Sequence, residues 1–553
     1  MSTHPVERAS EAYGYPLLIK QLLHSTLSSY ADQEIVYGLQ PQRRHTYAEM
    51  DQRIGRLGNT LRALGLQPGS TVAVMDWDSH RYLECFFAVP MLGCVLQTVN
   101  VRLSPEQIAY TLNHAQADVL LVNSDFLPVL KQIRGELTTL KACILLTDDE
   151  TPAPRGPGFA GEYEALLAQA DAHCEFPDFD ENTRATTFYT TGTTGLPKGV
   201  YFSHRQLVLH TLSTTAALGL AAKQGNLHHD DVYMPLTPMF HVHAWGMPYV
   251  ATMAGLKQVY PGRYVPDTIL QLIAAEKVTF SHGVPTVLHM VLSAPRAAET
   301  DLSALKMVVG GAAMTSALAQ TARARGIDIF TGYGMSETCP ILSLAQVPSA
   351  DLGTEQDLPT RLKTGRPVPL VALRTVDPDM RDCPRDGKTA GEVVVRAPWL
   401  TQAYLHNPEA SVALWEGGWL HTQDIGHIDQ RGYLQVTDRI KDVIKTGGEW
   451  VSSLEIEEII AHHAAVSEIA VIGVKDARWG ERPLALVVLK TDQAATLNKD
   501  QVREEILAHL RSAVDDGVIS KFGIPDRIEF VTELARTSVG KLNKRVMREH
   551  YQH

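Results

Sequence analysis

The stretch YTTGTTGLPKGV, from Tyr189 to Val200, is the most informative part of this 553-residue chain. It combines four threonines, three glycines and one lysine in a loop with apolar flanks. Glycine lets backbone N–H groups approach phosphate oxygens, threonine adds hydroxyl donors, and lysine adds positive charge. The stretch therefore predicts a loop that holds the phosphates of ATP, through Thr190, Thr191, Gly192, Thr193, Thr194, Gly195 and Lys198.

This loop differs from the common P-loop, in which Gly-Lys is followed by Ser or Thr at the start of a helix. Here Pro197 precedes Lys198 and Gly199 follows it. A flexible Gly/Thr surface loop is the alternative interpretation. Such loops rarely end in Pro-Lys-Gly followed by a β-branched residue, so we favour the phosphate-binding loop.

The composition indicates a multidomain globular protein that does not bind nucleic acid. A chain of 553 residues with 44% hydrophobic content exceeds what one core can use, so we expect two or more domains. The net charge is −12 and no basic run occurs, whereas binding a phosphate backbone requires concentrated Lys and Arg. The six cysteines form no C-x-x-C pair, which argues against a zinc knuckle and a disulfide framework.

The N-terminal residues and the apolar runs predict a cytoplasmic protein without an integral membrane segment. Residues 1–20 carry charges and prolines where a signal peptide requires an apolar core. The longest apolar run, around residues 85–96, is too short to span a bilayer. Peripheral association with a membrane stays open.

Alternating helix and strand patterns predict an α/β fold with doubly wound, largely parallel sheets. Ile54, Leu57, Leu61 and Leu64 have helical spacing before a glycine, and STVAVMD (70–76) reads as a strand. The same alternation returns in residues 81–100, 117–123 and 142–148. Short β-rich runs between helices are typical of buried parallel sheets.

Changes of composition divide the chain. Residues 148–183 are rich in Pro, Gly and acidic residues and predict a surface connection. A second α/β region reaches about residue 350, with strand-like runs at 278–291 and 304–314, and residues 364–438 are β-rich. After DRIKDVIKTGG (438–448), Ser452 and Glu455 have capping-box spacing at the head of an amphipathic helix.

We therefore predict an α/β architecture of three parts. Residues 1–438 form a large N-terminal domain of α/β subdomains plus a β-rich subdomain. Residues 439–446 form the connection to the next part. Residues 447–553 form a small α+β C-terminal domain.

Five motifs occur in order along the chain: YTTGTTGLPKGV (189–200), YGMSET (333–338), GWLHTQDIG (418–426), DRIKDVIKTGGEWVSS (438–453) and RTSVGK (536–541). Together they resemble the acyl-CoA synthetase family of adenylate-forming enzymes, and the resemblance covers most of the chain. The resemblance implies that residues 1–438 bind AMP and the acyl group, that residues 439–446 are a hinge region, and that the small C-terminal domain is mobile. It implies an acid–thiol ligase that uses ATP to convert a carboxylic acid into an acyl-adenylate, which coenzyme A then attacks. Two segments look closer to medium- and long-chain fatty-acyl ligases than to acetate or aryl ligases: EWVSS (449–453) and HVHAW (241–245).

The resemblance also implies magnesium. Displacement at the α-phosphate gathers negative charge and requires preorganised cations and a metal ion. Glu337 is similar to the family's magnesium carboxylate. One of Thr190, Thr191 and their neighbours supplies a hydroxyl ligand, for which we choose Thr191.

The remaining nucleotide contacts follow from the same resemblance. The adenine slot resembles Gly310, Gly311 and Ala312 on one side and Gly332, Tyr333, Gly334, Met335 and Ser336 on the other, with Ser336 where the family often has Thr. Asp424 is similar to the family's ribose ligand, with Arg439 as a second contact, and Lys445 and Trp450 complete the predicted set. Outside this context, Gly-Tyr-Gly and Asp-Ile-Gly would be read as ordinary turns.

Two lysines are assigned to different half-reactions by the resemblance. Lys541 is similar to the lysine that enters from the small domain and contacts the carboxylate and the α-phosphate. Lys441 is similar to the residue about which the small domain swings, which exchanges Lys541 for the hairpin of Gly447, Gly448 and Glu449 beside the pantetheine channel. With Thr191, Lys198 and His241, these two lysines form the predicted catalytic set.

The segment MFHVHAWGMPY (239–249) predicts a wall of the acyl pocket. His241 and His243 lack a third ligand at zinc-like spacing, so we do not expect a metal there. By resemblance, His241 borders the reacting carboxylate and Trp245 is similar to a gate on the fatty-acid tunnel. His243 stands where the long-chain group commonly has Asn.

Several alternatives remain at this stage. The acid could be aryl, branched or sulfur-containing. The fold could also serve an oxidative luciferase, a stand-alone adenylating domain, or an ATP-binding sensor without turnover, although Lys198, Glu337, Asp424, Lys441 and Lys541 are all present. We expect the partners to be the carboxylic acid, ATP and coenzyme A, and long-chain relatives suggest a homodimer.

Overall fold

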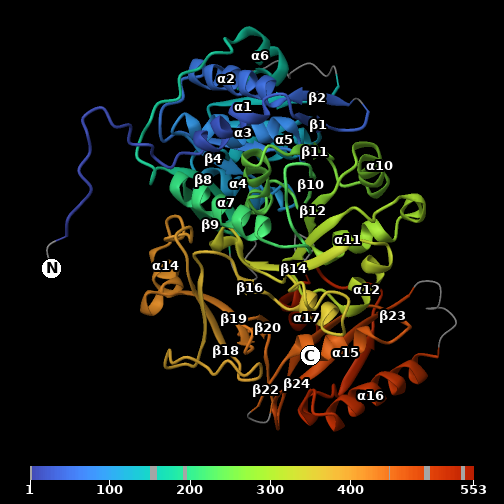
Figure 1. Cartoon of the computed structure of the whole chain (residues 1–553). Coiled ribbons are helices and arrows are strands. Elements are labelled where there is room, and N and C mark those ends of the chain that lie inside the picture. The colour runs from blue at the N-terminus through green and yellow to red at the C-terminus, as the bar shows by residue number, and fades with distance from the viewer. Residues whose placement is uncertain are drawn as a thin grey trace.

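The computed structural model describes residues 3–552 except 41, 150–157, 191–195, 447–448, 491–497 and 537–541, and the side chains of 449 and 450 are also outside the description. Two large α/β layers occupy one end of the molecule, and the β-rich and C-terminal parts occupy the other (Figure 1). Residues 3–15 are exposed, and the described part of the N-terminal segment extends away from the body (Figure 1).

The first sheet has seven strands in the order β7-β6-β5-β3-β4-β8-β9. All neighbours are parallel except β9, which is antiparallel to β8. Its strands are β3 (Thr71–Met75), β4 (Val95–Thr98), β5 (Ala117–Asn123), β6 (Ala142–Leu146), β7 (Phe159–Glu162), β8 (Arg184–Thr190) and β9 (Lys198–Ser203). The helices that accompany it are α2 (Tyr47–Ala63), α3 (His80–Met91), α4 (Pro105–His114), α5 (Leu127–Ile133) and α6 (Tyr163–Gln169).

The second sheet has nine strands in the order β16-β15-β14-β13-β12-β10-β11-β1-β2. Its strands are β1 (Glu34–Tyr37), β2 (Arg43–Thr46), β10 (Val232–Leu236), β11 (Lys257–Tyr260), β12 (Phe280–Gly283), β13 (Lys306–Gly310), β14 (Asp328–Gly334), β15 (Ile341–Leu344) and β16 (Arg366–Pro367). Its helices are α1 (Lys20–Tyr30), α7 (His204–Gly219), α8 (Val242–Trp245), α9 (Met247–Met253), α10 (Pro266–Glu276), α11 (Pro285–Leu292), α12 (Ser316–Ala324) and α13 (Asp357–Leu362). The strand-like run at 278–291 is therefore a short strand followed by a helix that starts at Pro285.

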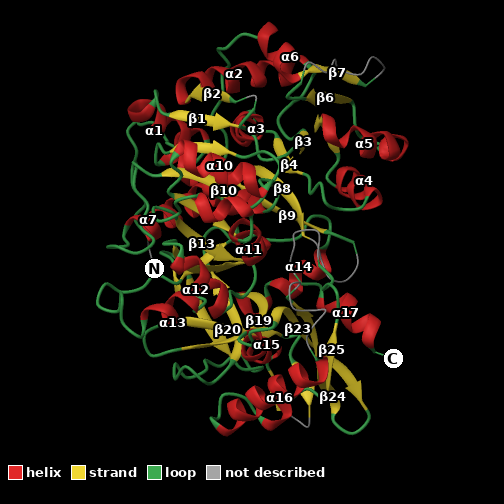
Figure 2. Cartoon of the chain, turned by 90° about the vertical axis from the view of Figure 1, so that its right-hand side faces the viewer, coloured by secondary structure: helices red, strands yellow, loops and turns green. Residues whose placement is uncertain are grey.

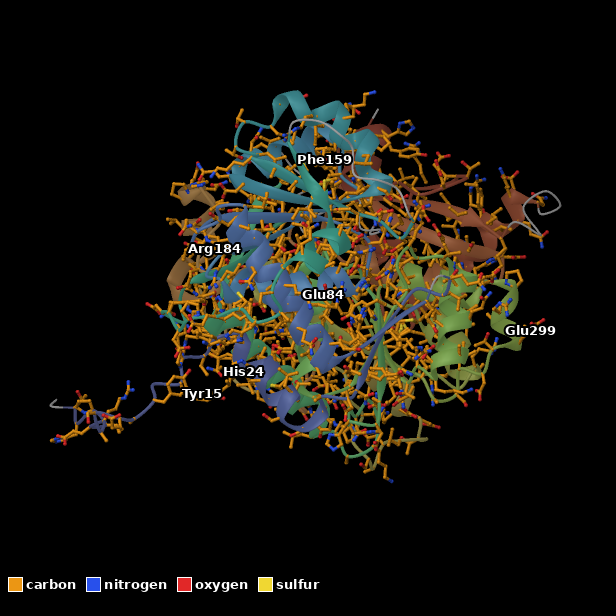
Figure 3. All side chains as sticks on the ribbon, turned by 90° about the horizontal axis from the view of Figure 1, so that it is seen from above. Tyr15, His24, Glu84, Phe159, Arg184 and Glu299 are labelled. Carbon is orange, nitrogen blue, oxygen red and sulfur yellow. The ribbon has the colours of Figure 1, made fainter. Side chains whose placement is uncertain are left out.

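One hydrophobic core joins the two sheets. It includes Phe86 of α3, Phe188 of β8 and Tyr249 of α9, all at most 2% exposed. A buried carboxylate ties the surrounding helices together. Glu84 accepts hydrogen bonds from Arg53 Nε at 2.7 Å and from the Tyr163 hydroxyl at 2.5 Å, and it lies in the middle of the body when the molecule is viewed from above (Figure 3).

The β-rich part is a four-stranded antiparallel sheet in the order β17-β18-β19-β20. Its elements are β17 (Ala372–Val376), β18 (Gly391–Arg396), α14 (Pro408–Leu414), β19 (Leu420–Ile428) and β20 (Leu434–Arg439). The chain then leaves this sheet, and β21 belongs to the next one. This crossing, residues 440–443, lies inside the predicted hinge region 439–446.

The C-terminal part is a mixed five-stranded sheet covered by helices (Figure 2). Its elements are β21 (Ile444–Thr446), β22 (Glu449–Val451), α15 (Ser453–Ala461), β23 (Val466–Asp476), β24 (Gly480–Leu489), α16 (Lys499–Asp515), β25 (Arg527–Phe530) and α17 (Lys544–Tyr551). The Ser452 side chain accepts a hydrogen bond from the Glu455 N–H at the start of α15, as the capping-box spacing predicts. The predicted fold class, α/β sheets with a β-rich part and a small α+β part, is confirmed. Its mobility stays a prediction.

Within the described residues, none of the helices is both long enough and apolar enough to cross a membrane.

Candidate active site

The glycine- and threonine-rich loop connects two antiparallel strands of the first sheet. β8 ends at Thr190 and β9 begins at Lys198, and these two residues pair directly across the strands. The sheet therefore fixes the two ends of the loop. Its central residues, Thr191, Gly192, Thr193, Thr194 and Gly195, lie outside the described residues.

A tyrosine joins this hairpin to the predicted magnesium carboxylate. The Lys198 ammonium lies 4.7 Å from the ring centre of Tyr404, within the range of a cation–π contact. On its other side, the Tyr404 hydroxyl donates to Glu337 Oε1 at 2.7 Å. Burial and the charge of Glu337 both raise the pKa of Tyr404 above its ordinary value, so its hydroxyl stays protonated as a donor.

Backbone hydrogen bonds hold the same three segments together. The Thr401 N–H donates to the Glu337 carbonyl at 2.9 Å, and the Leu405 N–H donates to the Gly199 carbonyl at 2.8 Å. Glu337 is 7% exposed. The structure thus places a buried carboxylate and a lysine on either side of one aromatic ring, at the mouth of the predicted phosphate loop.

The predicted adenine segments lie on neighbouring strands. Gly310 at the end of β13 pairs with Gly332 of β14. A Cβ at Gly310 would lie 2.5 Å from the Gly332 carbonyl and 3.1 Å from the Trp245 indole, so only glycine fits there. Gly334 is equally constrained, because a Cβ would lie 1.8 Å from the Pro340 carbonyl. The other members of the predicted slot follow these strands directly: Gly311, Ala312, Met335 and Ser336.

Tyr333, Asp424 and Arg439 form one hydrogen-bonded group. The Tyr333 hydroxyl donates to Asp424 Oδ2 at 2.7 Å, and Arg439 Nε lies 3.3 Å from Asp424 Oδ1. Asp424 and Arg439 face each other on β19 and β20. Burial alone would lower the pKa of Arg439, but the charges of Asp424 and Asp442 raise it above its ordinary value. Tyr333 thereby links the adenine segment to the predicted ribose carboxylate.

The histidine segment contains a left-handed helical turn. Val242, His243, Ala244, Trp245 and Gly246 have φ values of 50°, 55°, 47°, 59° and 71°. Left-handed helical conformation costs an L-residue about 1–2 kcal/mol, so four consecutive non-glycine residues here store strain that the surrounding contacts must hold. Such strain is concentrated at functional sites.

Aromatic side chains enclose the turn. The His243 ring is fully buried, and its ring centre lies 5.2 Å from that of Phe188 and 5.9 Å from that of Phe86. Burial lowers the pKa of His243 to about 3, so this ring is neutral. The Trp245 ring centre lies 5.1 Å from that of His282, whose Nε2 is 2.8 Å from the Tyr233 hydroxyl.

A buried aspartate fixes the entrance to the turn. Asp78 Oδ1 accepts a hydrogen bond from the Met239 N–H at 2.8 Å, and Oδ2 accepts one from the Tyr264 hydroxyl at 2.7 Å. The Thr98 hydroxyl donates to the Phe240 carbonyl at 3.0 Å. Burial raises the pKa of Asp78 to about 7. These contacts set the backbone immediately before His241.

The crossing between the β-rich and C-terminal sheets is also held by hydrogen bonds. Asp438 Oδ2 accepts from the N–H and the hydroxyl of Ser453, each at 2.7 Å, and the Ser452 hydroxyl donates to the Thr437 carbonyl at 2.6 Å. Burial, together with the charge of Arg439, lowers the pKa of Lys441 below its ordinary value.

The predicted residues of the small domain are only partly covered by the structure. Lys445 lies on β21, and Glu449 and Trp450 lie on β22, where the side chains of these two are not described. Gly447, Gly448 and Lys541 lie outside the described residues.

The structure therefore brings together Lys198 and Glu337, Gly310 and Trp245, and Tyr333 with Asp424 and Arg439. Sequence reasoning missed Tyr404 and Asp78. Neither has a local signal, because a single Tyr in a loop and a single Asp after a strand are common. Their partners are 67 and 161 residues away in the chain.

The described residues contain no group of three or more His, Cys, Asp or Glu side chains that could hold a metal ion. Magnesium has a different requirement, because it is usually held by one or two carboxylates, substrate phosphates and water. A single buried carboxylate beside the phosphate loop fits that requirement. Glu337 is such a carboxylate.

The structure combines a predicted phosphate loop, a carboxylate and a lysine that contact one tyrosine, and a separate C-terminal part on an α/β fold. Family profiles agree. A profile described as AMP-binding enzyme matches residues 23–405, and one described as AMP-binding enzyme C-terminal domain matches residues 455–541. The chain belongs to the AMP-binding enzyme family, and the resemblance to adenylate-forming acyl-CoA synthetases is confirmed.

Three relatives are similar over nearly their whole length. A long-chain-fatty-acid–CoA ligase of Thermus thermophilus is 42% identical over 92% of this chain and 90% of its own. A 3-methylmercaptopropionyl-CoA ligase of Ruegeria lacuscaerulensis is 37% identical over 97% of each chain. A medium-chain-fatty-acid–CoA ligase of Ectopseudomonas oleovorans is 36% identical over 92% of this chain and 91% of its own.

Solved structures of similar proteins carry the same fold. The anthranilate CoA ligase AuaEII in complex with anthranoyl-AMP has a TM-score of 0.84 at 26% identity, covering 97% of this chain and 98% of that one. ATP-bound MatB from Rhodopseudomonas palustris has a TM-score of 0.80 at 27% identity. Apo MatB from the same source has a TM-score of 0.72 at 26% identity. Both MatB comparisons cover 97% of this chain and 99% of the other.

Proposed function

We propose that the protein is an ATP-dependent acid–CoA ligase that activates a medium- or long-chain fatty acid as an acyl-adenylate and transfers it to coenzyme A. The observation that carries this proposal is the grouping of Lys198, Tyr404 and Glu337 at the phosphate hairpin, because activation of ATP needs positive charge and a metal-binding carboxylate there. Relatives named as long-chain and medium-chain fatty-acid–CoA ligases support the acyl substrate.

Glu337 would hold magnesium together with a hydroxyl of the phosphate loop, for which Thr191 is our assignment. When bound, the ion neutralises charge that develops on the phosphate oxygens. Tyr404 fixes the orientation of the Glu337 carboxylate through its hydrogen bond.

During adenylate formation, the phosphate loop and Lys198 would bind the phosphates, and Asp424 and Arg439 would bind the ribose. Tyr333 donates to Asp424, so its ring is held where it can stack on the base. Lys541 would enter from the small domain and stabilise the charge shared by the carboxylate and the α-phosphate. The carboxylate oxygen attacks the α-phosphorus, and pyrophosphate leaves.

During thioester formation, the small domain would turn about Lys441. The hairpin that carries Gly447, Gly448 and Glu449 would then replace Lys541 beside the acyl-adenylate. The thiol sulfur attacks the acyl carbon, its proton is lost to solvent, and AMP leaves.

His241 would border the reacting carboxylate, and Trp245 would gate the acyl pocket. The Trp245 indole lies against both His282 and the backbone at Gly310, so it stands between the acyl side and the adenine strand. Replacement of Trp245 by Ala should therefore change the KM for the acid, or the preferred chain length, more than the KM for ATP. Equal weakening of both would argue against a gate.

A pyrophosphate-release screen tests the function. Carboxylic acids of graded chain length, one aryl acid, one branched acid and one sulfur-containing acid would be assayed with and without coenzyme A. We expect release with medium or long fatty acids and a thioester product only with coenzyme A. Release without thioester formation would support a stand-alone adenylating domain, and absence of release with every acid would refute the proposal.

We also propose that the enzyme is cytoplasmic and forms a homodimer, and that it requires ATP, magnesium and coenzyme A but no nucleic acid. Light scattering at several protein concentrations would give the oligomeric state. Removal of magnesium by a chelator should abolish pyrophosphate release.

A further inference from the structure

One hydrogen bond connects the C-terminal part to the large domain far from the crossing at residues 440–443. Glu458 on α15 accepts a hydrogen bond from the Ser316 N–H at 3.1 Å through Oε1. These residues are 142 positions apart, whereas Asp438 and Ser453 at the crossing are 15 apart. The contact therefore depends on the position of the C-terminal part relative to the large domain, and not only on the local fold of residues 440–443.

The donor lies directly behind the predicted adenine segment. Residues 311–315 connect β13 to α12, and Ser316 is the first residue of α12. The N–H groups of the first turn of a helix have no partner inside the helix. The Thr315 side chain accepts the Leu318 N–H at 3.3 Å, and the Glu458 carboxylate accepts the Ser316 N–H. The small domain thus supplies one of the caps of α12.

Both partners belong to firmly packed elements. Ala319 and Ala322 of α12 are fully buried in a core of the large domain. Ile456 and Ile460 of α15 are fully buried in the core of the C-terminal sheet. The Glu458 side chain itself is 40% exposed, so it can leave its partner without disturbing either core. His462 is the titratable group beside it, with Nε2 at 3.9 Å from Glu458 Oε1.

The overall likeness is greater to two nucleotide-bound structures than to one apo structure. ATP-bound MatB matches this structure with a TM-score of 0.80 and apo MatB with 0.72. The anthranoyl-AMP complex matches at 0.84.

We propose that Glu458 is a positioning residue that docks the small domain on the nucleotide-binding segment for adenylate formation, by capping α12 at Ser316. A nucleotide that orders residues 310–312 would also fix the Ser316 N–H, and docking of Glu458 would in turn order that segment. Coupling of this kind is reciprocal, so loss of the contact must weaken ATP binding. This inference rests on the proposed acyl-adenylate mechanism.

Two variants remove the contact from opposite sides. Glu458→Ala removes the acceptor. Ser316→Pro removes the donor, and proline is well suited to the first position of a helix because its φ is preset and its missing N–H needs no intrahelical partner. Thr315 has φ −72° and ψ 149°, a conformation that a residue before proline adopts readily. Glu504→Ala is the matched control, since this glutamate lies on α16 of the same domain and is 70% exposed.

The two half-reactions would be measured separately. In ATP–pyrophosphate exchange with the acid, Glu458→Ala and Ser316→Pro should each raise the KM for ATP by about three- to tenfold, the range for loss of one hydrogen bond. Thioester formation from supplied acyl-adenylate and coenzyme A should keep the wild-type rate. Glu504→Ala should match the wild type in both assays. The double variant should be no worse than either single variant, because both delete the same interaction.

Additive effects, an unchanged KM for ATP in either single variant, or equal slowing of both half-reactions would each overturn the proposal. Thermal unfolding of every variant would establish that the fold is retained. If the wild type exchanges pyrophosphate with none of the acids, the proposed function fails. If the wild type exchanges and the two variants behave as Glu504→Ala does, only the role of Glu458 fails.

Discussion

The left-handed turn at residues 242–246 can be tested by replacing Ala244 with glycine. Ala244 has φ 47° and ψ 48° and is fully buried. Relief of the left-handed backbone strain should raise the free energy of unfolding by about 1–2 kcal/mol. Two effects lower the free energy of unfolding. Loss of one buried methyl group costs about 0.8 kcal/mol, and the greater backbone entropy of glycine in the unfolded chain costs about 0.5–1 kcal/mol. The opposing effects nearly cancel, so we expect Ala244→Gly to leave the free energy of unfolding almost unchanged.

Ala251→Gly is the matched control. Ala251 is equally buried and lies in the right-handed helix α9, a few residues further along the same core. It loses the same methyl group and gains the same unfolded-state entropy, but no strain is relieved. We therefore expect a loss of roughly 1.3–1.8 kcal/mol in its free energy of unfolding.

Equilibrium urea unfolding of the two variants and the wild type would measure the difference. The reasoning predicts that Ala251→Gly is less stable than Ala244→Gly by about 1–2 kcal/mol. Equal destabilisation would refute the view that the turn is strained. A second readout concerns function: glycine at 244 loosens the backbone that sets His241 and Trp245, so the KM for the acid should rise while the KM for ATP stays constant.

Three further predictions concern other parts of the site. Tyr404→Phe should raise the magnesium concentration for half-maximal pyrophosphate release by about tenfold, because it frees the carboxylate that would hold the ion; an unchanged value would contradict the fit to magnesium. Lys541→Ala should block adenylate formation but be bypassed by supplied acyl-adenylate, whereas Lys441→Pro should form the adenylate and slow its conversion to thioester; identical defects in both assays would exclude domain alternation. Burial raises the pKa of Asp78 to about 7, so the carboxyl of the folded protein keeps its proton while that of the unfolded chain loses it from pH 4 upward. The free energy of unfolding of the wild type should therefore fall between pH 4 and pH 7 relative to that of Asp78→Asn. If urea unfolding gave the same pH dependence for both proteins, the assignment would be wrong.

Local patterns predicted most of the elements that carry the site. The capping spacing of Ser452 and Glu455 marked the start of α15, and the apolar run at 70–76 marked β3. These signals are local because a cap or a strand pattern is set by residues a few positions apart. The order of the five motifs then indicated the family.

Long-range contacts carry no such local signal. Tyr404, Asp78 and Glu458 each act on a residue at least 67 positions away, and nothing in their own neighbourhoods distinguishes them from ordinary loop or surface residues. The left-handed turn is a stronger case, because its sequence points the other way. A β-branched residue such as Val242 avoids positive φ, and the segment has a single glycine, at its end. Asp78 and Thr98 hold the backbone before the turn, and aromatic rings pack against His243 and Trp245 within it.

The segment 401–405 shows how such contacts give the site its geometry. The Thr401 N–H donates to the carbonyl of Glu337, in the connection between β14 and β15 of the second sheet, and the Leu405 N–H donates to the carbonyl of Gly199 on β9 of the first sheet. The Tyr404 side chain lies between these two bonds and contacts Lys198 and the Glu337 carboxylate. A lysine and a carboxylate from different sheets are therefore kept one ring apart by a third segment that need not touch a substrate. Side chains also hold this segment, because Thr401 and Leu405 are buried and the Thr401 hydroxyl donates to the Tyr201 carbonyl. Loss of the Tyr404 ring would leave the lysine and the carboxylate free to form an ion pair with each other, which would withdraw both charges from the phosphates.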